Sequence, residues 1–480
     1  MNFAEAVKNE SKWTRTENGA MALNTTSDKV LDLFSTVGAL RNTTDERITT
    51  LVSEAYNENT DLTLKTLFWA RDIREGAGER NVFRVAIKWL ANYHPDSVSK
   101  NIQYFGEYGR YDDLYCLIGT PVEDEMWSYV RAQLIEDMRN CTAGKSISLL
   151  AKWLKTADAS SDNTRKLGIY TAKKLGLSVY IYKRMVRKLR KHIKIVESQM
   201  CAKEWDQIQY DEIPGRASMI YRKAFKRHDE ERYNAFIQKA VSGEAKIHSE
   251  TLYPYDLVRQ AFNREDMTAE AQWRQLPNYV EPGTNAIVIA DTSGSMWGQP
   301  ICSAVGLALY FAEHNTGAYH NLWMNFSDSP AWQTVRGETL HQKINNACNA
   351  HWGMNTNAEA AFDLILSTAI ENKVSATEMP KSIIIISDME FDYCGGARWT
   401  FYDRMRAKFA AHGYEIPNVI FWNVNRRHDV FHADKNRKGV ILCSGQSTTT
   451  FKSILNSINE TPTEYMMRVL GGERYAAIAA

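Results

Sequence analysis

The segment DTSGS (Asp291 to Ser295) combines one carboxylate with two hydroxyls at alternate positions. In an extended loop, alternate side chains point the same way, so the oxygens of Asp291, Ser293 and Ser295 can face one ligand. Such an oxygen-only set suits Mg²⁺ or Mn²⁺, which keep several waters and take few protein charges. The alternative is an ordinary turn, because Asp, Ser and Gly also gather in turns for local hydrogen bonding.

The elements around this loop indicate an α/β fold with a doubly wound parallel sheet. The apolar run AIVIA directly precedes Asp291, as expected for a strand that is buried on both faces. Further strands are predicted in NLWMNFSD, KSIIIISDMEFD, NVIFWNVN and GVILCSG, and helical patterns such as CSAVGLALYFAEH lie between them. Ligands of such sheets bind beyond the carboxyl ends of the strands. We therefore expect the loops around Ser293, Thr356 and Asp388 to share one edge.

These residues resemble the metal-ion-dependent adhesion site of von Willebrand factor type A domains. The matching positions are the Asp-x-Ser-x-Ser motif, a later threonine and a strand-ending aspartate: Asp291, Ser293, Ser295, Thr356 and Asp388. The resemblance implies a bound Mg²⁺ (or Mn²⁺) with an open coordination position for an acidic side chain of a partner. One departure is GMNTN, which stands where many members carry two adjacent glycines before the threonine.

Length and composition bound the rest of the chain. The type A resemblance covers residues 283–480 of 480, which leaves residues 1–275 for a second domain. A net charge of +1 excludes a uniformly basic nucleic-acid binder but allows a local basic patch. Seven cysteines without a Cys-x-x-Cys pair favour a reducing, cytoplasmic location. We find neither a membrane-spanning apolar run nor an N-terminal leader pattern.

The first part of the chain reads as helices from end to end. Apolar residues recur at helical spacing through residues 45–93, and the connector REGAGER contains two glycines that favour a tight turn. Consecutive helix pairs of this size predict an all-α domain of HEAT-like α-solenoid type over residues 1–275. No strict repeat period is visible.

A basic segment in this half is a candidate RNA-binding surface. YKRMVRKLRKHIKIV (Tyr182 to Val196) contains no acid, and its apolar residues recur at helical spacing, which predicts one amphipathic helix. The cations of this segment and of the nearby RKAFKR cluster are Lys183, Arg184, Arg187, Lys188, Arg190, Lys191, Lys194, Arg222, Lys223, Lys226 and Arg227. They favour contact with a polyanion. The alternative is a solvated helix face that pairs with acids elsewhere.

Four tyrosines of this part of the chain are candidates for stacking on unpaired bases, although tyrosines in helices more often pack in the core: Tyr170, Tyr180, Tyr182 and Tyr221.

The whole organisation resembles the Ro ribonucleoprotein (TROVE) family, and more closely an uncharacterised TROVE-related family of phage and plants. The matching segments are ARDIREGAGER, YGRYDDL and SLLAKWL, together with the adhesion-site motif. The resemblance implies a ring of helical repeats that is closed by the type A domain. It also implies binding of single-stranded and structured RNA.

The residues do not indicate catalysis. No nucleophile, general base and orienting group can be assembled from local spacing, and CTAGKS lacks the first glycine of a phosphate-binding loop. We therefore predict a non-enzymatic RNA-binding scaffold with a metal-bearing docking domain. The alternative is a metal-dependent protein-docking module without nucleic acid. The sequence leaves the oligomeric state open.

Overall fold

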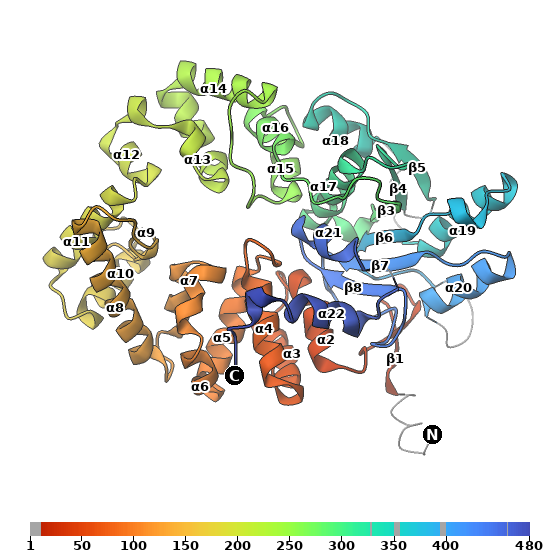
Figure 1. Ribbon diagram of the computed structural model, residues 1–480, viewed down its shortest axis with the longest axis horizontal. Helices are drawn as coiled ribbons and strands as arrows, with labels where there is room; N and C mark the ends of the chain where they lie inside the picture. Colours follow the sequence, from red (N-terminus) through yellow and green to blue (C-terminus); the bar gives the residue numbers. More distant parts are fainter. Residues whose placement is uncertain (1–10, 327–328, 350–355, 394–399, 458) are drawn as a thin grey trace.

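The computed structural model describes residues 11–326, 329–349, 356–393, 400–457 and 459–480. Its elements follow one another around a ring (Figure 1). Helices lead from α2 (Lys29–Phe34) to α16 (Met267–Arg274), and a six-stranded sheet with its own helices follows. The C-terminus then returns to the helices near the start of the chain.

Helices dominate the first part of the chain, as predicted. Between α2 and α16 lie α3 (Asp45–Glu58), α4 (Thr60–Arg71), α5 (Arg80–Tyr93), α6 (Pro95–Ser99), α7 (Phe105–Tyr108), α8 (Glu123–Thr142), α9 (Leu150–Trp153), α10 (Asp162–Lys174), α11 (Val179–His192), α12 (Val196–Ala202), α13 (Gly215–His228), α14 (Glu230–Ser242) and α15 (Pro254–Ala261). Short 3₁₀ turns are η1 (Val37–Ala39), η2 (Ile102–Tyr104), η3 (Tyr111–Leu117), η4 (Trp205–Gln207) and η5 (Tyr210–Glu212).

Polar side chains fix where several of these helices begin. The Asn59 side chain accepts a hydrogen bond from the Leu62 amide at 3.0 Å at the start of α4. The Ser178 hydroxyl accepts one from the Ile181 amide at 3.3 Å at the start of α11. Both contacts satisfy an amide that has no partner within the first turn of its helix.

The prediction that residues 1–275 are all-α is wrong for residues 13–23. Strands β1 (Trp13–Arg15) and β2 (Met21–Leu23) form an antiparallel hairpin there. Its buried residues Ala20, Ala22 and Leu23 pack into a hydrophobic core that also contains Phe391 and Phe431 of the C-terminal part. Each strand has only three residues, so the hairpin depends on this distant partner rather than on a pattern of its own.

The C-terminal part contains the expected α/β sheet. Its strands are β3 (Ala286–Asp291), β4 (Leu322–Phe326), β5 (Ala331–Thr334), β6 (Ser382–Ser387), β7 (Asn418–Asn423) and β8 (Val440–Ser444), in the order β5-β4-β3-β6-β7-β8. All neighbours pair in parallel except β5, which pairs with β4 antiparallel. The predicted doubly wound parallel sheet is therefore mixed, because this edge strand is antiparallel. Residues 327–330 alone connect β4 and β5, too few for the crossover that a parallel pair needs.

Both faces of this sheet are covered. Its helices are α17 (Gln299–His314), α18 (Leu340–Cys348), α19 (Ala358–Glu371), α20 (Phe401–Ala411), α21 (Thr449–Ile454) and α22 (Pro462–Leu470), with 3₁₀ turns η6 (Gly294–Met296), η7 (Ala376–Glu378) and η8 (Glu473–Tyr475). Along β3, Val288 and Ala290 join the core shared with the helical part, whereas Ile287 and Ile289 join the core of α19, α20 and the hairpin. This alternation explains the continuous apolar run of β3.

A buried charge joins the C-terminal end of the chain to the helices near its start. Asp72 follows α4 and is fully buried. Its carboxylate accepts hydrogen bonds from the Arg474 guanidinium, with Nη2 at 2.8 Å, and from the Tyr475 hydroxyl at 3.1 Å. Arg474 and Tyr475 belong to η8, which thereby docks on the first helices and closes the ring (Figure 1).

Within the described residues, no helix combines the length and the apolar character that a membrane crossing requires. Six described cysteines carry free thiols, and Cys394 lies outside the described residues.

Replacing Asp72 by alanine should destabilise the protein strongly. The change leaves the Arg474 guanidinium without its buried partner, which costs about 3 kcal/mol. The matched control is Asp124→Ala, because that carboxylate is 90% exposed in its ion pair with Lys174 and should change stability by only about 0.5 kcal/mol. Thermal unfolding of both variants checks this, and equal melting temperatures would contradict the stabilising role of the buried contact between Asp72 and Arg474.

Candidate metal centre

Two buried carboxylates meet at the carboxyl edge of the sheet. Asp291 is the last residue of β3, and Asp388 directly follows the neighbouring parallel strand β6. Both aspartates are fully buried. The Ser387 hydroxyl, at the end of β6, donates a hydrogen bond to Asp291 Oδ2 at 2.6 Å and so connects the two strand ends.

The loop after β3 adds hydroxyl oxygens to this edge. The Ser293 amide donates to Asp291 Oδ1 at 2.9 Å, which folds the loop back over the strand end. The hydroxyls of Ser293 and Ser295 lie 3.1 Å apart. The Ser295 hydroxyl also interacts with Asp388 and lowers the pKa of that carboxyl. Four of the five expected metal ligands therefore lie in one group.

The fifth expected ligand, Thr356, is tied to the segment that follows Asp388. Its amide donates to Asp392 Oδ2 at 2.9 Å, and its carbonyl accepts from the Asp392 amide at 2.9 Å. Thr356 is buried. The residues 350–355 before it, which include most of the GMNTN motif, lie outside the described residues.

The electrostatics of this group fit a divalent cation. Burial, followed by the charge of Asp388, raises the pKa of Asp291 to about 7. Burial also raises the pKa of Asp388, against the opposing effects of the Ser295 hydroxyl and the Arg427 guanidinium. Asp388 Oδ2 has no hydrogen-bond partner among the described residues. Two buried like charges and an unsatisfied carboxylate oxygen are stabilised best by a hard cation.

The rim of the site contains groups that sequence reasoning missed. Arg427 follows β7, and its Nη1 lies 3.7 Å from Asp388 Oδ2. Its Nη2 lies 2.6 Å from a carboxylate oxygen of Glu17, in the turn of the β1–β2 hairpin. Glu390, which is fully buried, accepts from the Glu17 amide at 2.6 Å and lies 3.0 Å from His428 Nδ1. Glu390 stands two residues after Asp388, and this alternate spacing is a signal that could have been used.

The basic segment departs from the predicted single helix. Helix α11 ends at His192, Lys194 has a left-handed backbone conformation with φ of 49°, and α12 begins at Val196. One amphipathic helix over residues 182–196 is therefore wrong. Leu189 is buried as expected, whereas Met185 and Ile193 are only half-buried.

Three of the predicted RNA-binding cations are engaged within the protein. Arg190 donates to the carbonyl of Ala151 at 2.8 Å and to the carbonyl of Leu154 at 2.7 Å. Arg222 forms an ion pair with Asp266 at 2.8 Å. Lys183 pairs with Asp158 at 2.9 Å. These contacts hold neighbouring elements together, and Arg190 in particular links α11 to the carbonyl groups of α9 and of the residue after it.

The other eight cations are exposed on α11, on the turn after it and on α13: Arg184, Arg187, Lys188, Lys191, Lys194, Lys223, Lys226 and Arg227. None of them forms an ion pair with another residue in the described part of the chain. Two of them interact more weakly within the protein: the charge of Arg187 adds to the hydrogen bond from Lys183 in lowering the pKa of Asp158, and Lys188 donates a hydrogen bond to the Thr142 hydroxyl at 3.5 Å.

Three of the four candidate stacking tyrosines donate hydrogen bonds within the protein. Tyr182 is buried and donates to the Lys155 carbonyl at 2.7 Å. Tyr170 donates to Glu123, and Tyr221 donates to Glu197 at 3.2 Å. Tyr180, at the start of α11, is 73% exposed. Of the four, Tyr180 is the one whose ring is free to stack on a base.

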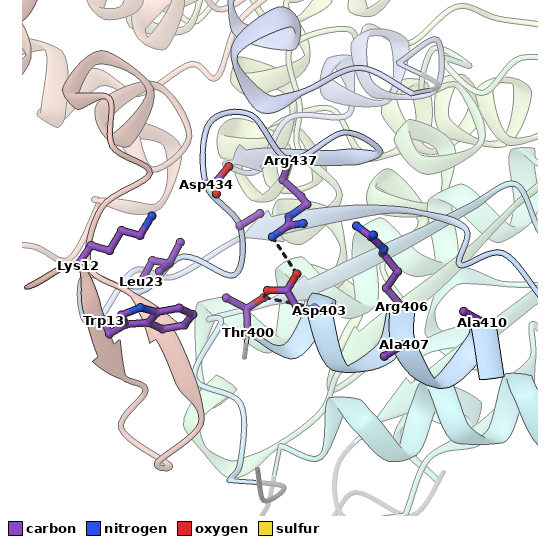
Figure 2. A pocket seen from close by; sticks show the side chains of 11 residues that line it. Lys12, Trp13, Leu23, Thr400, Asp403, Arg406, Ala407, Ala410, Asp434 and Arg437 are labelled. Atoms are coloured by element: carbon purple, nitrogen blue, oxygen red, sulfur yellow. Dashed lines mark hydrogen bonds and ion pairs between the residues drawn. The ribbon is translucent and has the colours of Figure 1, made fainter. Parts of the chain in front are cut away.

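A separate cavity of about 510 Å³ lies between the hairpin and α20 (Figure 2). Its lining includes Trp13 and Leu23 on one side and Arg406 on the other. An ion pair of 2.8 Å between Arg437 and Asp403 crosses it. None of the residues expected to bind metal or RNA lines this cavity, so it is distinct from the candidate metal centre.

Comparisons with known proteins divide the chain in the same way as its fold. Residues 285–473 match a family described as Domain of unknown function (DUF7788). Residues 16–133 and 170–281 match a second one, Domain of unknown function (DUF2828). The chain is also similar to Uncharacterized protein L728 of Acanthamoeba polyphaga mimivirus, with 29% identity over 95% of this chain and 86% of the relative.

Replacing Asp291 by asparagine should change how stability depends on pH in the metal-free protein. Because the folded-state pKa of about 7 lies above the ordinary value of 3.8, Asp291 destabilises the fold as pH rises between these two values. In EDTA at about pH 8, the free energy of unfolding of Asp291→Asn should therefore be higher than that of the wild type by about 1 kcal/mol or more. The two proteins should converge near about pH 4.

Thermal unfolding in EDTA across this pH range measures the difference. Glu415→Gln is the control, because it neutralises an exposed carboxylate of the same region. A difference between wild type and Asp291→Asn that does not vary with pH would contradict the raised pKa of the buried Asp291 carboxyl.

Proposed function

We propose that this protein is a non-enzymatic RNA-binding scaffold whose C-terminal α/β part carries a cation-dependent docking site. The observation that carries the RNA assignment is the group of eight exposed cations without internal ion pairs in the described part of the chain. A chain with a net charge of +1 that exposes eight cations without ion pairs among its described residues, on α11, on the turn after it and on α13, suits a polyanionic partner.

The arrangement of these cations favours contacts with RNA phosphates over sequence-specific contacts with the bases. They are exposed lysines and arginines on helix surfaces, and such side chains neutralise phosphates without distinguishing sequences. Tyr180, one turn before Arg184 on α11, offers a ring for an unpaired base. The proposed partner is therefore RNA with a single-stranded part, bound mainly through its phosphates.

The resemblance to TROVE proteins supports the same proposal. It rests on the ARDIREGAGER, YGRYDDL and SLLAKWL segments and on the adhesion-site motif. The closed order of elements around the ring suits a HEAT-like solenoid that is completed by a von Willebrand type A domain (Figure 1). In this proposal the helical part binds the RNA, and the sheet both closes the ring and holds the cation site.

A second candidate function, cation-dependent docking of a protein, is favoured by the buried carboxylate pair. Asp291, Ser293, Ser295, Thr356 and Asp388 would hold Mg²⁺ or Mn²⁺, directly or through water. The bound ion would supply a positive docking point for an acidic side chain. The chain's own residues orient the site, since the hydroxyl of Ser387 and the amide of Ser293 fix the Asp291 carboxylate.

Reversing Arg187, Lys188 and Lys191 to glutamate should weaken binding of all RNAs to a similar degree. The slope of log affinity against log salt should flatten by about one unit for each phosphate that the variant no longer neutralises. The fold should survive, because all three side chains are exposed and Leu189 stays packed. Salt titrations against single-stranded and hairpin RNA measure both quantities.

The matched control reverses three exposed lysines of the C-terminal part, Lys381, Lys438 and Lys452, and so makes the same change in net charge. If both triple variants lose the same affinity, the effect reflects net charge and not a site. If neither loses affinity, the protein-docking function becomes the better account.

Replacing Asp291 by alanine should abolish Mn²⁺ binding in calorimetry. The change removes one of the two negative charges that offset dehydration of the ion. Glu415→Gln should leave the affinity unchanged, since its carboxylate is exposed and distant in sequence from the site residues. An unaltered Mn²⁺ affinity of Asp291→Ala would refute the assignment of these ligands.

A further inference from the structure

The side chain of Arg427 lies between two carboxylates of different kinds. One is Asp388 of the proposed cation site, which is fully buried, with Oδ2 3.7 Å from Arg427 Nη1. The other is Glu17 of the N-terminal hairpin, whose side chain is 42% exposed and lies 2.6 Å from Arg427 Nη2. The guanidinium thus makes its shorter contact at the rim and its longer contact with the site.

Glu17 is held in place by hydrogen bonds of its own amide and of its two neighbours, Thr16 and Asn18. The Glu17 amide donates to Glu390 at 2.6 Å, and the Thr16 hydroxyl donates to the Phe391 carbonyl at 2.6 Å. The Asn18 side-chain amide donates to the Glu390 carbonyl at 2.7 Å, and the Asn18 carbonyl accepts from the Tyr393 amide at 3.0 Å. This turn is therefore fastened along the same segment that begins with Asp388.

A guanidinium and a divalent cation cannot both lie against Asp388 Oδ2 without repelling each other. The guanidinium partly stabilises the buried carboxylate when no ion is bound. When an ion binds, the like charge of Arg427 a few ångströms away opposes it. The further the guanidinium is drawn towards Glu17, the smaller this opposition becomes.

We propose that Arg427 competes with the divalent cation for Asp388, and that Glu17 controls this competition by holding the guanidinium at the rim. The inference rests on the proposed cation site and adds its regulation. The N-terminal hairpin thereby belongs to the site, although Glu17 lies 373 positions away in the sequence from Glu390, which it contacts. Any partner that binds the hairpin or replaces Glu17 would change the affinity of the site for its ion.

The test is Mn²⁺ calorimetry on the full chain in a double-mutant cycle. Arg427→Gln removes the competitor and should tighten Mn²⁺ binding by about fivefold or more. Glu17→Gln frees the guanidinium to turn towards Asp388 and should weaken binding by a similar factor. In the Arg427→Gln background, Glu17→Gln should change the logarithm of the Mn²⁺ affinity by less than half as much as it does in the wild type. The reason is that no guanidinium then remains for Glu17 to hold.

Two controls isolate this pair from general charge effects. Arg406→Gln and Glu415→Gln make the same charge changes at exposed positions of the C-terminal part and should leave the affinity unchanged. Unfolding of every variant in EDTA verifies that each one is folded.

The outcomes separate this inference from the function on which it rests. If the wild type binds Mn²⁺ and Asp291→Ala abolishes binding, but the cycle shows no change, the cation site stands and the competition is refuted. Tighter binding by Glu17→Gln, or additive effects in the cycle, would also overturn it. If the wild type binds no Mn²⁺, the cation site itself fails and the inference fails with it.

Discussion

The parallel pairing of β3 with β6 brings two aspartates to one edge of the sheet, where neither is exposed to water. Burial of one carboxylate is unfavourable, and burial of two close together is more so. The surroundings offset this cost only in part, through the Ser387 hydroxyl, the Ser293 amide and the Arg427 guanidinium at the rim. A cation at this edge would explain why the fold keeps both carboxyl groups buried together.

The closure of the chain on itself determines what surrounds that edge. The hairpin at residues 13–23 packs into one core of the sheet, and η8 at the other end of the chain docks on Asp72. The helical part and the sheet are therefore joined at both ends as well as at the junction after α16. As a result, the rim of the proposed cation site combines residues from the beginning of the chain with residues after β7.

Much of the sheet and its polar edge could be predicted from the sequence. Apolar runs before Asp291 and Asp388 predict buried strands of a parallel sheet, and they place both aspartates at the carboxyl edge of that sheet. The hairpin could not, since its short strands are stabilised by residues such as Phe431 that are distant in sequence. Glu17 was missed for the same reason. Its role depends on Arg427 and not on any local motif.

The basic segment shows a second reason why sequence-based prediction was incomplete. The cations of α11 are recognisable as a group, but the sequence does not distinguish Arg190, whose partners are carbonyl groups near α9, from its exposed neighbours. The break at Lys194 was missed because the segment contains no glycine or proline there, and a left-handed lysine leaves no signature in the pattern. Strand β5 is short and partly exposed, so its antiparallel direction follows from the brief connection to β4 and not from its residues.

The most direct measurement of the central claim is anomalous diffraction from crystals of the full chain grown with Mn²⁺. We expect one strong anomalous peak among the oxygens of Asp291, Ser293, Ser295 and Asp388, with the Arg427 guanidinium turned towards Glu17. A crystal that shows no peak at this edge, with Arg427 still against Asp388, would contradict the account. So would a peak confined to the Glu17, Glu390 and His428 group, because the ion would then lie on the rim and leave the buried carboxylates uncompensated.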